Sequence, residues 1–99
     1  MSNKTTLSLP PKGAQAVFKF QLPIRPDTRE VYLERGARVV HVAVQGTMLA
    51  VWYLCVPGTE REPDKFHVRF TGDAAPEGAK YQGTAVLEDG AYILHLFRG

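Results

Sequence analysis

The sequence predicts an all-β, or mainly β, domain: a small antiparallel sandwich or partly open barrel of about six to seven short strands. Three observations support this prediction. Apolar and polar residues alternate with a period of two in several short segments, which is typical of half-buried strands. Turn residues separate these segments at nearly regular spacing. No window shows the apolar period of an amphipathic helix.

The N-terminal segment differs from the rest of the chain. Residues 1–14 show no apolar period and include two adjacent prolines. We expect them to form a flexible N-terminal tail or arm, and residues 15–99 to form a single β domain. The chain has 99 residues, which is enough for one hydrophobic core but not for two.

Alternation defines the first three predicted strands. Residues 17–22 form the first strand, and its apolar face carries Phe18, Phe20 and Leu22. Prolines end this strand because they cannot donate to a sheet ladder. A second strand over residues 28–34 turns inward Val31 and Leu33. A third strand over residues 38–45 turns inward Val40, Val42 and Val44.

The fourth predicted strand, residues 48–56, follows a tight turn at Gly46 and is apolar on both faces. We expect it to be a central strand covered on both sides. Trp52 and Tyr53 point to opposite faces, and one of them should fill the core. This strand also carries a second apolar stripe, formed by Leu49, Val51, Tyr53 and Cys55. Either the same sheet folded over or another subunit must cover this stripe. We therefore expect a homo-oligomer.

The remaining strands are separated by loops. Residues 57–64 form a polar loop, and the next strand, residues 65–71, has an inward face of Phe66, Val68 and Phe70. A second loop covers residues 72–78. A weaker strand over residues 81–87 contains Gly83, which is typical of a bulge. The dipeptide Asp89-Gly90 predicts a hairpin to the last strand, residues 91–97.

Composition excludes several classes of function. Lys and Arg number 12 against 10 Asp and Glu, a net charge of +2 without a basic cluster, so nucleic acid is not an expected partner. The single cysteine, Cys55, permits neither an internal disulfide nor a thiolate zinc site, and its apolar strand predicts burial. No segment has the pattern of a signal peptide or membrane helix, which indicates a cytoplasmic protein.

Several short motifs resemble a family of small uncharacterised proteins of tailed bacteriophages and prophages. They are Phe18 to Leu22, Gly36 to Gln45, the tryptophan-bearing segment Leu49 to Pro57, Phe70 to Asp73, Tyr81 to Thr84, and Ile93 to Phe97. The likeness covers residues 17–99. It implies a viral accessory protein made in the host cytoplasm, and it implies no catalytic residues.

The fifth predicted strand carries the candidate ligand-binding residues. Lys65, His67 and Arg69 alternate along it and therefore line one face. With Tyr53 or Arg98 nearby, they could contact an anion and a nucleobase, because the arginine fork suits phosphate. An ordinary solvated strand face is the plainer interpretation.

The sequence contains no catalytic motif and predicts no cofactor. Three histidines, His41, His67 and His95, could hold a catalytic zinc ion only if their strands were neighbours. The first hypothesis is therefore a non-enzymatic phage accessory protein that counters host defence. It would act by sequestering a small anionic, nucleotide-like signal or by inhibiting a host protein. The alternatives are a minor virion or assembly protein and a metal-dependent hydrolase that uses the three histidines.

Overall fold

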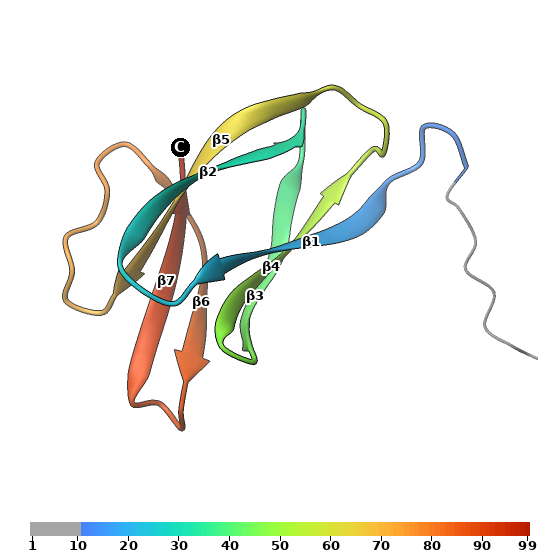
Figure 1. Ribbon diagram of the computed structural model, residues 1–99. Helices are drawn as coiled ribbons and strands as arrows, with labels where there is room; N and C mark the ends of the chain where they lie inside the picture. Colours follow the sequence, from blue (N-terminus) through green and yellow to red (C-terminus); the bar gives the residue numbers. More distant parts are fainter. Residues whose placement is uncertain (1–10) are drawn as a thin grey trace, which may run out of the picture.

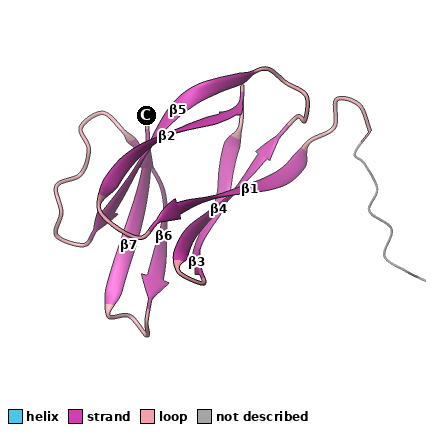
Figure 2. Ribbon diagram, viewed as in Figure 1, coloured by secondary structure: helices cyan, strands magenta, loops and turns pink. Residues whose placement is uncertain are grey.

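The computed structural model describes residues 11–99, and this part of the chain consists of seven strands joined by loops and turns (Figure 1, Figure 2). The strands are β1 (Ala16–Pro23), β2 (Asp27–Glu34), β3 (Arg38–Gln45), β4 (Met48–Cys55), β5 (Arg61–Phe70), β6 (Lys80–Leu87) and β7 (Tyr92–Arg98). No helix in the described residues could cross a membrane. The tail predicted over residues 1–14 lies mostly outside the described part.

Two antiparallel sheets pack face to face, so the predicted sandwich is confirmed and the barrel alternative is not. One sheet has the strand order β1-β4-β3, and the other has the order β2-β5-β7-β6. Two hairpins were expected from turn chemistry, and both form: β3 pairs with β4, and β6 pairs with β7. At the second hairpin, the Ala91 amide donates to the Glu88 carbonyl, and Asp89 and Gly90 both have positive φ. Two positive φ angles are the signature of a type I′ turn.

The core lies between the two inner sheet faces. From the three-stranded sheet it takes the stripe of β4 that ends in Cys55, and from the four-stranded sheet it takes Phe66, Val68, Leu94 and Leu96. The four-stranded sheet of the same chain therefore buries this apolar stripe of β4. Of the neighbours Trp52 and Tyr53, Tyr53 is the one that enters the core, with 4% of its surface exposed.

Trp52 lies on the outer face of the three-stranded sheet, where neighbouring side chains shield it. The Lys19 ammonium lies 5.8 Å from its ring centroid, and the His41 ring lies 5.4 Å from it on the other side. Lys19 also donates to Gln45 Oε1 across 2.5 Å, from β1 to β3 over the intervening β4. Ala50 of β4 is fully buried. Long polar side chains thus cover part of this apolar face.

Two sequence expectations about the strands are wrong. Val40 is exposed, because a β-bulge shifts the register between Val39 and His41 and takes Val40 off the inner face. Residues 61–64 are strand and not loop, and they pair with the end of β2. Pro63 is tolerated there because β7 pairs with β5 only from Phe66 onward, which leaves an edge beside the proline.

Candidate functional site

The structure places Lys65, His67 and Arg69 together on the outer face of the four-stranded sheet. They alternate along β5 with the core residues Phe66 and Val68, which are at most 2% exposed. Their degree of exposure differs from the expectation of a solvated row. Lys65 is exposed, Arg69 is half-buried, and His67 is buried with 9% of its surface exposed.

His67 is held at both ring nitrogens. Its Nε2 lies 3.0 Å from the Gly99 carbonyl oxygen, and its Nδ1 lies 2.8 Å from Thr28 Oγ1. Because a carbonyl oxygen only accepts, Nε2 carries the proton. In the neutral imidazole, the Thr28 hydroxyl then donates to Nδ1. The ring therefore has a structural role between β2 and the end of the chain, and it has no nitrogen free for a metal or a substrate.

Tyr53 and Arg98 do not lie beside this row, so the expectation that they would is wrong. Tyr53 belongs to the other sheet and points into the core. Arg98 is on the inner side of β7, where its Nε lies 2.6 Å from Asp64 Oδ2 and its Nη1 donates to the Ala37 carbonyl across 2.8 Å. Side chains two residues apart in a strand point to the same face, so Arg98 shares the inner face of β7 with the buried Leu94 and Leu96.

The three histidines do not converge, because the strand that carries His41 lies in a different sheet from the two neighbouring strands that carry His67 and His95. His41 is in the three-stranded sheet, whereas His67 and His95 are in β5 and β7 of the other sheet. His95 is also held at both nitrogens, by Thr71 Oγ1 at 2.9 Å and by Thr84 Oγ1 at 3.1 Å. In the described part of the chain, no group of three histidine, cysteine or acidic residues lies close enough to hold a metal ion.

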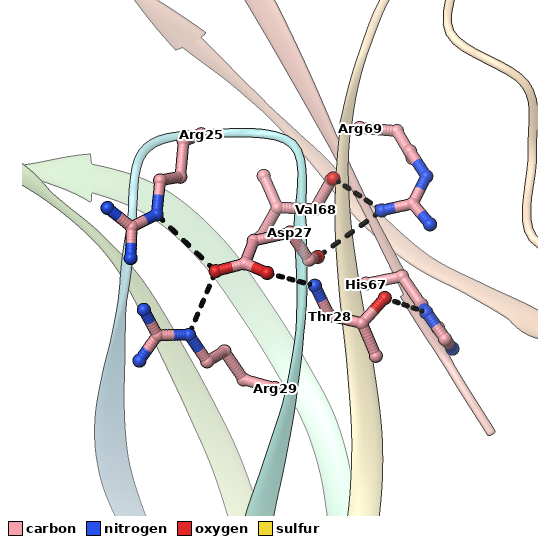
Figure 3. A network of polar contacts seen from close by, with 7 residues as sticks. All are labelled: Arg25, Asp27, Thr28, Arg29, His67, Val68 and Arg69. Atoms are coloured by element: carbon pink, nitrogen blue, oxygen red, sulfur yellow. Dashed lines mark hydrogen bonds and ion pairs between the residues drawn. The ribbon is translucent and has the colours of Figure 1, made fainter.

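A hollow of about 550 Å³ opens where β2 begins and β5 ends, and we call it the Arg69 hollow. It is lined by the start of β2, by Arg69 and by the loop after β5: Pro26, Asp27, Thr28, Arg69, Asp73, Ala74, Ala75 and Pro76. Arg69 Nη1 donates to the Val68 carbonyl at 2.9 Å and to the Asp27 carbonyl at 3.2 Å (Figure 3). The guanidinium is therefore anchored at one nitrogen in the wall of the hollow.

Asp27, which lines the hollow, binds two arginines that do not line it, Arg25 and Arg29. Its Oδ2 accepts hydrogen bonds from Arg29 Nε at 3.0 Å and from Arg25 Nε at 3.4 Å, and its Oδ1 accepts from the Thr28 amide at 2.8 Å (Figure 3). The hydrogen bond from Arg29, followed by the one from the Thr28 amide, lowers the pKa of Asp27. This group was not predicted from the sequence, although the spacing of Arg25, Asp27 and Arg29 at every second residue was a signal for it.

A second polar group, buried between the sheets, surrounds Glu34. Its carboxylate is 4% exposed and accepts hydrogen bonds from the Tyr53 hydroxyl and from Arg61 Nη2, each across 3.2 Å. Burial raises the pKa of Tyr53 to about 12, helped by the charge of Glu34. Burial and the same charge raise the pKa of the Cys55 thiol. A thiol that stays protonated is a poor nucleophile, so this group is structural.

Comparison with known proteins gives one family. A family model described as a domain of unknown function (DUF7352) matches residues 14–99, and the chain therefore belongs to that family. No curated protein and no solved structure matches the chain.

Proposed function

We propose that this member of the DUF7352 family is a non-enzymatic binding protein that takes a small phosphate-bearing ligand in the Arg69 hollow. The observation that carries the proposal is the anchoring of Arg69. Only its Nη1 is used by the two carbonyls, and among the described residues its Nε and Nη2 have no hydrogen-bond partner. A planar guanidinium held in place with free N–H groups suits a phosphate oxygen pair.

The charged residues that line the hollow are Arg69, Asp27 and Asp73. The two carboxylates are engaged, since Asp27 binds two arginines and Asp73 Oδ2 accepts from the Phe70 amide at 2.8 Å. Arg25 and Arg29 bind Asp27 but do not line the hollow, so among the lining residues the guanidinium of Arg69 is the one cationic group. The volume of about 550 Å³ lies within the usual range for small-molecule sites.

Isothermal titration calorimetry of the full chain with pyrophosphate tests the proposal. We expect the wild type to bind, Arg69→Ala to abolish measurable binding, and Arg69→Lys to restore only part of it, because lysine lacks the fork. Lys80→Ala is the matched control, since Lys80 is an exposed cation on the distant edge strand β6. Wild-type protein that does not bind pyrophosphate, or an Arg69→Ala variant that binds it normally, contradicts the proposal.

The biological setting remains a prediction from the phage-family resemblance: an accessory protein that sequesters an anionic signal used in host defence. Inhibition of a host protein and a role as a minor virion component are the alternatives. Affinity purification from host lysate with small molecules retained separates them. A co-purifying nucleotide supports sequestration, whereas a host or virion protein in equal amount without a small molecule opposes it.

A further inference from the structure

The outer face of the four-stranded sheet carries one row of side chains that crosses all four strands. The register pairs Thr28 of β2 with His67 of β5, His67 with Phe97 of β7, and Phe97 with Tyr81 of β6. Paired residues of neighbouring strands point to the same face. The row therefore runs from Thr28, in the wall of the Arg69 hollow, to an aromatic pair at the far edge of the sheet.

Tyr81 is the exposed ring of this pair, and it is held in place. Its surface is 58% exposed, and its centroid lies 5.9 Å from that of Phe97 at an interplanar angle of 69°. Its hydroxyl forms a hydrogen bond with Thr84 Oγ1. A ring fixed by packing on one side and a hydrogen bond at its tip loses little freedom when a ligand stacks on it.

A second, parallel row connects this aromatic pair with the cation of the hollow. Arg69 pairs with His95 of β7, and His95 pairs with Thr84 of β6. The two threonine contacts described above fix the imidazole of His95 between them. Neighbouring strands are about 4.8 Å apart, so β5 and β6, which flank β7, are separated by about 10 Å. Because the Arg69 guanidinium reaches the Asp27 carbonyl of β2, one strand beyond β5, it lies about 10–14 Å from Tyr81 across the sheet.

We infer that the ligand of this face is a nucleoside di- or triphosphate, with its base stacked on Tyr81 and its phosphates on Arg69; this inference rests on the proposed function. Aromatic rings bind bases through stacking, and arginine binds phosphate through paired hydrogen bonds. A single phosphate lies too near its base to bridge the distance between Tyr81 and the Arg69 guanidinium, whereas a chain of phosphates can. Lys65, exposed two residues from His67 along β5, adds a second cation to the same face.

Calorimetry with two ligands, ATP and pyrophosphate, tests the inference on the full chain. We expect Tyr81→Ala to weaken ATP binding about tenfold, the usual order for loss of one stacking ring, and to leave pyrophosphate binding unchanged. Tyr81→Phe should bind ATP like the wild type, because it keeps the ring. Tyr92→Ala is the matched control: Tyr92 is 54% exposed, but alternation along β7 places it on the face opposite to His95 and Phe97.

The outcomes separate this inference from the proposed function. If Tyr81→Ala binds ATP normally while pyrophosphate binding still depends on Arg69, the nucleotide assignment is overturned and the phosphate site stands. If neither ligand binds, both are overturned. A single-stranded oligonucleotide that binds about tenfold more tightly than ATP at equal salt concentration would also overturn the assignment to a free nucleotide.

Discussion

The hydroxyl of Tyr53 donates a hydrogen bond to the buried carboxylate of Glu34, and this contact joins the two sheets of the sandwich. Tyr53 belongs to β4 of the three-stranded sheet, and Glu34 ends β2 of the four-stranded sheet. A buried carboxylate is costly unless donors satisfy it. Tyr53 and Arg61 supply those donors, so a polar pair inside an apolar core fixes how the sheets sit on each other.

We expect Tyr53→Phe to lower the free energy of unfolding by about 1–3 kcal/mol, because it removes a donor from a buried charged group. Urea unfolding followed by circular dichroism measures the change. Tyr32→Phe is the control, since Tyr32 is 56% exposed. A Tyr53→Phe variant as stable as the wild type would show that the hydrogen bond does not contribute to stability.

Stability should fall as the solution becomes acidic. Burial is the largest influence on Glu34 and raises its pKa, but its backbone hydrogen bond, Arg61 and Tyr53 together outweigh burial and lower the pKa below the ordinary value for a glutamate. A lowered folded-state pKa contributes stability above the unfolded pKa and loses it as the pH falls through the folded value. The measurement is the urea midpoint from neutral pH to pH about 3, a range that spans the ordinary glutamate pKa.

Glu34→Gln separates this effect from the same trend at Asp27. We expect the glutamine variant to be less stable than the wild type at neutral pH and to lose less stability on acidification. Asp27, whose pKa is also lowered, contributes equally to both proteins, so it cancels from the difference. Parallel pH profiles for the two proteins would contradict a role for Glu34.

Gly83 allows β6 to approach β3 of the other sheet. A Cβ built on Gly83 lies 2.8 Å from Val42 Cγ2 and 3.2 Å from Val42 Cβ. We expect Gly83→Ala to destabilise the protein by about 1–3 kcal/mol through overpacking against a stiff, branched side chain. The double variant with Val42→Ala should recover part of this loss in a double-mutant cycle. Strict additivity of the two changes in unfolding free energy would argue against the contact.

Cys55 should react slowly with thiol reagents in the folded protein. Its side chain is 2% exposed, and burial, followed by the Glu34 charge, raises its pKa. Because the thiolate is the reactive form, labelling by a colorimetric disulfide reagent should await unfolding. The reaction should become fast in urea above the unfolding midpoint. Rapid labelling of native protein would show that this end of the sandwich opens readily.

Much of the fold could be predicted from single residues and their spacing. Phe66, Val68 and the outward row that begins at Lys65 were assigned to the correct faces because alternation in a strand is a local property. The candidate site was only partly predictable. Arg69 was predicted as a site residue, but one wall of the hollow beside it comes from Pro26, Asp27 and Thr28, which are distant in the sequence, and local periodicity does not predict long-range contacts.

The sequence by itself determined the seven strands, the two hairpins and the inward residues of most strands, since side-chain alternation and turn chemistry act over a few residues. Only the tertiary structure decided that β2 leaves its sequence neighbours to pair with β5. That pairing places Thr28 beside His67 and Glu34 beside Arg61, and it separates His41 from the other histidines. Strand order depends on which apolar faces bury each other across the whole chain, so it cannot be predicted from any one segment.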